Sequence, residues 1–126
     1  MSVPSSLSRY LLMPPTVTSH EGVTSTVEAV YRFDLDFPGF DGHFPGNPIV
    51  PGIVQIMLVV RTACHDSVGQ LQGIKRCKFT RPVRPFECLK IVAEITDKET
   101  ERFCKATLWV EDEPSAIMSL TVIMQP

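Results

Sequence analysis

Apolar and polar residues alternate over residues 23–36 with the two-residue period of a half-buried strand. The side of this strand expected to face the core consists of Val27, Ala29, Tyr31, Phe33 and Leu35. The same alternation returns over residues 89–96, 104–110 and 116–124, separated by polar turns, and it predicts an antiparallel meander. Shorter strands are expected at residues 16–20 and 73–79. Residues 9–13 are expected to form a short element that Pro14 and Pro15 end.

Residues 53–64 follow a different pattern, because apolar side chains fall on nearly every face of a helix and are interrupted mainly by Gln55 and Arg61. A helix that is apolar all round is expected to be buried. We expect it to end near His65 and Asp66. One long buried helix with about five or six strands predicts an α+β architecture in which the sheet wraps the helix.

The loop before this helix, residues 37–52, holds four prolines, four glycines and His43. Prolines fix the backbone angle φ, so the loop is expected to be held in one shape. Pro51 suits a first helical position, where its missing N–H costs nothing. The positive end of the helix, with its unpaired N–H groups, should therefore face the loop that carries His43.

Length and composition narrow the class of protein. The 126 residues are expected to form one domain, with residues 1–8 disordered. A net charge of −2 argues against nucleic acid as a partner. The four cysteines have no metal-ligand spacing and fall in apolar elements, so we expect buried free thiols and no metal site. The apolar run is too short for a membrane span, and the N-terminus lacks a signal-peptide core, so a cytoplasmic protein is expected.

The eleven residues of 42–52, GHFPGNPIVPG, resemble the signature of the 3-hydroxyacyl-[acyl carrier protein] dehydratases, a hot-dog fold family. Residues 73–85, GIKRCKFTRPVRP, are similar to the strand and link that follow the central helix in that family. The resemblance implies the hot-dog fold, acyl-thioester tunnels between paired subunits, and His43 as the catalytic acid and base. It also implies that the backbone N–H of Gly52 holds the thioester carbonyl.

The resemblance implies further pocket residues, and the chain departs from the family pattern at Met57 and at Arg61, where the dehydratases commonly have Gln. Phe44, Pro51, Gln55, Met57 and Arg61 are the other expected pocket residues. The second catalytic residue of the family, a Glu or Asp, lies fourteen positions after the histidine, where this chain has Met57. Methionine can neither donate nor accept a catalytic proton. The leading prediction is a homodimeric dehydratase of the fatty-acid or polyketide type. The alternatives are a non-catalytic acyl-thioester binding subunit or half of a heterodimeric dehydratase, and, last, a hot-dog thioesterase.

Basic residues cluster after the helix, at Lys75, Arg76, Lys78, Arg81, Arg84 and Lys90. A charge run of this kind is often no more than the solvated face of a strand. The family resemblance implies a second interpretation, in which the residues from Lys75 to Arg84 bind an acidic acyl carrier protein. The expected partners are an acyl carrier protein or coenzyme A thioester and a second subunit, in a homodimer or an assembly of dimers. No cofactor is expected beyond the phosphopantetheine that carries the substrate.

Overall fold

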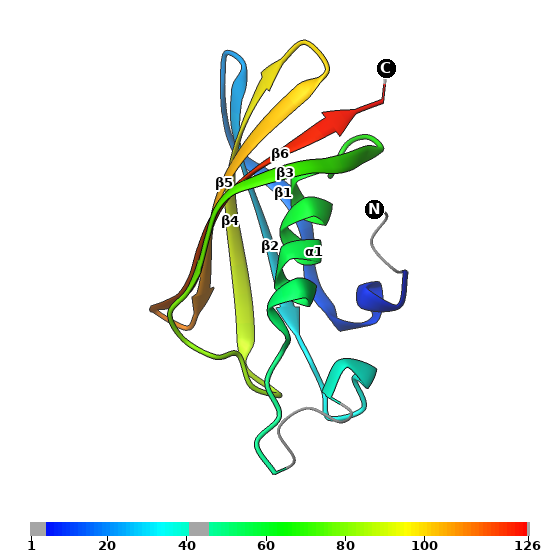
Figure 1. The fold of residues 1–126 in the computed structure, drawn as a ribbon, viewed down its shortest axis with the longest axis vertical. Helices are drawn as coiled ribbons and strands as arrows, with labels where there is room; N and C mark the ends of the chain where they lie inside the picture. Colours follow the sequence, from blue (N-terminus) through cyan, green and yellow to red (C-terminus); the bar gives the residue numbers. More distant parts are fainter. Residues whose placement is uncertain (1–4, 41–45, 126) are drawn as a thin grey trace.

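The computed structural model describes residues 5–40 and 46–125, and these form a six-stranded antiparallel sheet and one α-helix (Figure 1). The elements in chain order are a 3₁₀ helix (Ser5–Tyr10), β1 (Leu11–Glu21), β2 (Thr24–Arg32), a 3₁₀ turn (Pro38–Phe40), α1 (Gly52–Ala63), β3 (Gly69–Phe79), β4 (Cys88–Lys98), β5 (Glu101–Val110) and β6 (Glu113–Met124).

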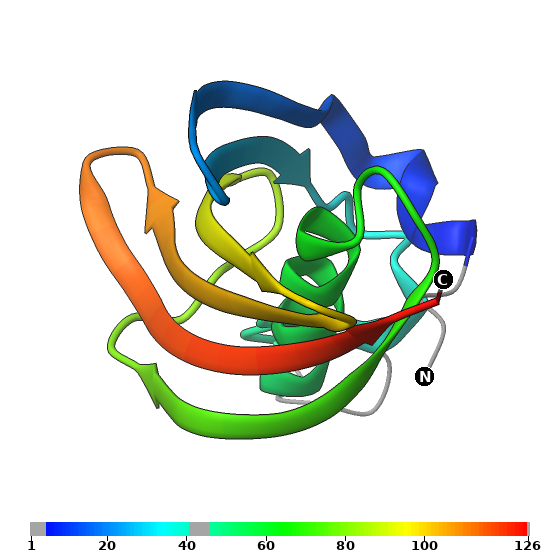
Figure 2. The ribbon, with the colours of Figure 1, turned by 90° about the horizontal axis from the view of Figure 1, so that it is seen from above.

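The sheet has the strand order β1-β2-β4-β5-β6-β3 and curls around α1, as the view from above shows (Figure 2). The alternation read from the sequence places side chains correctly in β2, β4 and β5. The inward residues of these strands are buried: Val27, Ala29, Tyr31, Leu89, Ile91, Ala93, Ile95, Cys104, Ala106, Leu108 and Val110. The predicted α+β class, with a sheet wrapped around one helix, is confirmed.

Helix α1 is shorter and less enclosed than predicted. It ends at Ala63, with Cys64 as the C-cap, and does not reach His65. Leu58, Val59, Val60 and Ala63 are buried against the sheet, but Ile53 is 52% exposed and Met57 is only half-buried. The prediction that every face is buried is therefore wrong. The described residues of the single chain leave one apolar side of the helix uncovered.

The two edge strands of the sheet differ in chemistry. The edge strand β1 contains Pro14 and Pro15, and its pairing with β2 shifts register between Met13 and Thr16. Proline has no N–H to donate, which confines it to edges and bulges of sheets. The opposite edge strand, β3, is eleven residues long, has no proline and is mostly exposed. The backbone of β3 therefore keeps hydrogen-bonding groups for a further strand.

Several predictions about element boundaries are wrong. Residues 9–21 do not break at the prolines, because β1 runs through them. The strand β2 ends at Arg32, and Leu35, expected in the core, is 63% exposed in the turn that follows. The strand β3 starts at Gly69 rather than at residue 73.

The N-terminus and the cysteines also differ from expectation. Residues 5–8, expected to be disordered, belong to a 3₁₀ helix whose Leu7 is buried. Residues 1–4 lie outside the described residues. Of the four cysteines expected to be buried, only Cys104 is; Cys64 is half-buried, and Cys77 and Cys88 are exposed.

The side chain of Arg102, on β5, fixes the C-terminal end of α1. Its guanidinium donates to the carbonyl oxygen of Ala63 at 2.8 Å, to Asp66 Oδ1 at 2.7 Å and to Asp97 Oδ1 at 2.6 Å. A cation at this position satisfies a carbonyl that the helix leaves unpaired and suits the negative end of its dipole. One buried arginine thus joins the helix end, the loop after it and the β4–β5 hairpin.

Candidate functional site

The N-terminal end of α1 is held by the chain on either side of it. Pro51 is the N-cap, one residue before the first helical position that was predicted for it, with φ of −60° and ψ of 147°. The carbonyl oxygen of Pro51 accepts from the N–H groups of Val54 and Gln55, and the N–H of Val50 donates to Val83 at 2.8 Å. The first N–H groups of a helix have no partner within it. The N–H of Gly52 is therefore presented, at a fixed position, by the start of α1.

A cavity of about 350 Å³ opens at this helix end. Its lining residues are Ile49, Val50, Gly52, Gln55, Phe79, Thr80, Arg81 and Pro82. The ring of Phe79 lies so close to Gly52 that a Cβ at position 52 would sit 2.9 Å from Phe79 Cζ. Only glycine lets the ring and the helix end approach this closely.

Gln55 enters this cavity one turn after Gly52. The sequence placed it among the pocket residues, and its side chain is 3% exposed. Its Nε2 donates to the carbonyl oxygen of Val50 at 3.1 Å, which ties the helix to the loop before it. Gly52, Gln55 and Phe79 thus form one wall. Phe79 was not among the predicted pocket residues, although it belongs to the segment that resembles the dehydratases.

The predicted pocket residue Pro51 does not line this cavity, and neither do Met57 and Arg61. Met57 and Arg61 are both half-buried, and they lie on the side of α1 away from Gln55. Arg61 lies near the buried hydroxyl of Tyr31. Burial raises the pKa of that hydroxyl, and the positive charge of Arg61 opposes the rise. No salt bridge within residues 5–40 and 46–125 involves Arg61. His43 and Phe44, the other two predicted residues, lie outside the described residues.

The predicted basic residues separate into two groups. Lys75, Arg76 and Lys78, on β3, are exposed, and so is Arg84 in the link that follows. Arg81 is engaged differently: its guanidinium donates to both oxygens of Glu87, at 3.1 and 2.8 Å, and also pairs with Glu113. The hydrogen bonds from Arg81 lower the pKa of Glu87.

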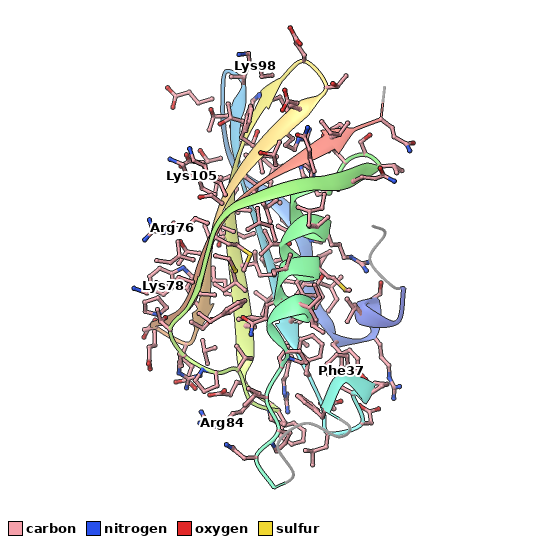
Figure 3. The ribbon with its side chains drawn as sticks, viewed as in Figure 1. Phe37, Arg76, Lys78, Arg84, Lys98 and Lys105 are labelled. Atoms are coloured by element: carbon pink, nitrogen blue, oxygen red, sulfur yellow. The ribbon has the colours of Figure 1, made fainter. Side chains whose placement is uncertain are left out.

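The outer face of the sheet carries a second cavity, of about 630 Å³, and Lys75, Arg76 and Lys105 contribute to its lining. Arg76 and Lys105 are both paired with Ser119 in the sheet, so they flank one residue of β6. Arg76, Lys78 and Lys105 point away from α1 (Figure 3). Sequence reasoning missed Lys105, because only the register of β5 and β3 with β6 places it across one strand from Arg76.

Two negative findings concern the described part of the chain. No group of three or more His, Cys, Asp or Glu side chains among these residues could hold a metal ion. No helix in the same residues has the length and apolar character needed to cross a membrane.

Comparison with known proteins shows similarity to 3-hydroxyacyl-[acyl-carrier-protein] dehydratases. The 3-hydroxyacyl-[acyl-carrier-protein] dehydratase FabZ of Acetivibrio thermocellus is 39% identical over 69 residues, which are 48% of this chain and 47% of that protein. FabZ of Klebsiella pneumoniae is 31% identical over 104 residues, 74% of this chain and 66% of that one. The chain thus spans about half the length of the first of these relatives.

Solved structures agree on the fold. The dehydratase heterocomplex ApeI:P from Xenorhabdus doucetiae has a TM-score of 0.63 and 21% identity over 88% of this chain and 99% of that chain. At this identity the likeness establishes the hot-dog fold. A family model described as ApeI-like, ApeI dehydratase, matches residues 19–115. The resemblance to dehydratases found in the sequence is therefore confirmed, and the chain belongs to the ApeI-like dehydratase family.

Proposed function

We propose that this chain acts on 3-hydroxyacyl thioesters as a dehydratase-type protein and interconverts them with trans-2-enoyl thioesters. The observation that carries the proposal is the start of α1, where Gly52, whose N–H has no partner within the helix, lines a cavity of about 350 Å³. An N–H at the positive end of a helix stabilises negative charge on an oxygen. The thioester carbonyl develops that charge during dehydration.

The reaction assigns one task to each part of the site. A base removes a proton from C2, and the electron pair moves onto the thioester oxygen, where Gly52 stabilises it. The enolate then re-forms the carbonyl as the C2–C3 double bond forms and the C3–O bond breaks. The departing hydroxide takes up a proton and leaves as water. His43 is our candidate for the proton transfers, because an imidazole can act as base and acid near neutral pH.

Within a single chain His43 would have to serve as both base and acid, because Met57 stands where a helix carboxylate was expected. We propose that a second subunit completes the site. The uncovered side of α1, with Ile53 52% exposed, is an apolar surface that a partner would bury. In a homodimer the partner repeats Met57. The heterocomplex described for the ApeI:P dehydratase favours a second candidate, in which this chain is half of a heterodimer and the other chain supplies a carboxylate.

The substrate would be carried on phosphopantetheine, from an acyl carrier protein or from coenzyme A. Arg76 and Lys78 are exposed on β3, whose last residue, Phe79, lines the cavity. An acidic carrier bound to these cations would therefore lie close to the site. Because Arg81 is paired with Glu87 and Glu113, we assign it a structural role beside the docking residues.

The test is hydration of a short 2-enoyl-acyl carrier protein by the purified chain, with His43→Ala and Met57→Glu alongside. Formation of the 3-hydroxyacyl product is followed by mass spectrometry, and release of free thiol is followed in the same samples. We expect turnover by the wild type alone or after mixing with a partner chain, and loss of that turnover in His43→Ala.

The possible results separate the candidates. Activity of the wild type alone supports a homodimeric dehydratase whose acid lies outside α1. A silent wild type that Met57→Glu or a partner chain activates supports the heterodimer. Release of free thiol without hydration would refute a dehydratase and identify a thioesterase. If no sample shows activity, the result would support a non-catalytic acyl-thioester binding subunit.

A further inference from the structure

Two buried side-chain polar atoms in the described residues have no hydrogen-bond partner, Tyr31 Oη and Gln55 Oε1. A buried acceptor without a partner is costly, and most such atoms in folded proteins are paired. Gln55 is 3% exposed, so bulk water does not replace the missing bond. Of the two atoms, only Gln55 Oε1 belongs to a residue that lines the cavity at the start of α1.

The orientation of the Gln55 amide follows from its other contact. Its nitrogen lies 3.1 Å from the carbonyl oxygen of Val50, which can only accept a hydrogen bond. Exchanging the two ends of the amide would place oxygen against oxygen. The NH₂ group is therefore used by Val50, and the unpaired atom is an acceptor that requires a donor.

The other polar groups of the cavity wall are already engaged. Thr80 Oγ1 donates to the carbonyl oxygen of Pro114 at 3.1 Å, and Arg81 is paired with Glu87 and Glu113. At the start of α1 two groups remain for a ligand: the N–H of Gly52, which donates, and Gln55 Oε1, which accepts. Residues three apart on a helix are neighbours on one face. The start of α1 thus holds one donor and one acceptor on two residues that share a face of the helix.

We propose that Gln55 Oε1 accepts a hydrogen bond from the 3-hydroxyl of the acyl chain whose carbonyl is bound by the N–H of Gly52. This assignment rests on the proposed function. A 3-hydroxyacyl thioester carries an acceptor on C1 and a donor on C3, which match the two groups of the wall. The 2-enoyl product has no hydroxyl, so its formation returns Gln55 Oε1 to the unpaired state. Gln55 thereby distinguishes the hydroxylated compound from its dehydrated product.

The test compares two unreactive ligands that differ by one oxygen, the pantetheine amides of 3-hydroxyhexanoic and hexanoic acid. In both, NH replaces the thioester sulfur, which makes the C2 proton much less acidic. Isothermal titration calorimetry on the full chain measures the affinity for each. We expect the wild type to bind the hydroxylated amide roughly three- to tenfold more tightly, the range of one net hydrogen bond.

Two variants separate recognition of the hydroxyl from general packing. Gln55→Met keeps the length of the side chain and removes the acceptor, so the preference should fall to about onefold. Tyr31→Phe removes the other unpaired buried group, outside the cavity lining, and should keep the wild-type preference. The wild-type comparison needs no variant, so the test holds even if Gln55→Met is unstable.

Equal affinity of the wild type for the two amides, or no binding of either, overturns the assignment. It is also overturned if Gln55→Met weakens both ligands equally, since the donor would then be an N–H of the pantetheine arm. A retained preference for the hydroxyl in a protein that fails to hydrate any enoyl thioester would refute the catalytic proposal and leave this one standing.

Discussion

Replacing Gly52 by alanine should impair ligand binding much more than folding. The added Cβ would lie 2.9 Å from Phe79 Cζ and 3.0 Å from Cε2, whereas carbon atoms in contact are about 3.5–4.0 Å apart. The ring must therefore move by more than half an ångström. Because Phe79 is 44% exposed, it can rotate without disturbing the core.

The expected change in the free energy of unfolding is the sum of two opposed terms. Overpacking costs about 1–3 kcal/mol, and alanine is favoured over glycine in a helix by about 1 kcal/mol. We therefore expect Gly52→Ala to lose no more than about 2 kcal/mol in urea unfolding. The methyl group and the displaced ring both crowd the N–H of residue 52. Loss of one oxyanion donor lowers turnover by about 10²–10³ in other enzymes, and we expect a loss of at least tenfold here.

A second substitution tests this reasoning. Phe79→Ala removes the ring that the new methyl group meets, so Gly52→Ala should cost less stability in that background than in the wild type. The coupling free energy between residues in contact is about 0.5–3 kcal/mol. The matched control is Gly73→Ala, since a Cβ at position 73 meets no atom within 4 Å. Wild-type affinity and turnover in Gly52→Ala, together with additive stabilities, would refute the close approach of Phe79 to the helix end.

Two other predictions follow from the charges. Arg102→Met should lower the free energy of unfolding by about 2–4 kcal/mol at pH 7, because several charge-assisted hydrogen bonds are lost while both carboxylates stay partly solvated. Hydrogen bonding from Arg102 lowers the pKa of Asp66 below its ordinary 3.8, so this stabilisation is present above that pH and is lost as the pH falls through the folded-state pKa. Urea unfolding of both proteins at pH 3 and pH 7 should show the difference shrinking at pH 3; an unchanged difference would contradict the assignment. Arg76→Glu with Lys78→Glu should weaken binding of an acidic carrier protein at least tenfold at low salt and leave the pantetheine amides unaffected, which calorimetry can check; equal losses for both ligands would argue against docking.

The sequence predicts the fold best in strands where the two-residue alternation alone decides which side chains face the core. Alternation is enough for β2, β4 and β5, since one face of each strand packs on the core. It fails for β1, because an edge strand tolerates Pro14 and Pro15 with a shift of register. It also fails at the start of β3, where residues 69–72 show no clear alternation and are held by pairing with β6. These features depend on which strand lies beside which.

The candidate site also has parts that the sequence predicts and parts that depend on tertiary contacts. The resemblance to the dehydratases points to Gly52, and Gln55 is one of the few polar residues that interrupt the apolar helix. The sequence does not reveal that the ring of Phe79 covers Gly52 or that Gln55 Oε1 is left unpaired, since both depend on tertiary contacts. The pairing of Arg81 with Glu87 and Glu113 is likewise invisible in a run of basic residues.

The unequal edges of the sheet limit how the protein can associate. A strand can add its backbone hydrogen bonds along β3, but Pro14 and Pro15 interrupt any ladder along the outer side of β1. If a second copy of the chain pairs its own β3 with β3, both outer edges of the enlarged sheet are β1 strands. The prolines of these strands prevent the addition of a further strand. Growth then stops after a single step. Raising the protein concentration should increase the fraction of dimers and should not produce fibres.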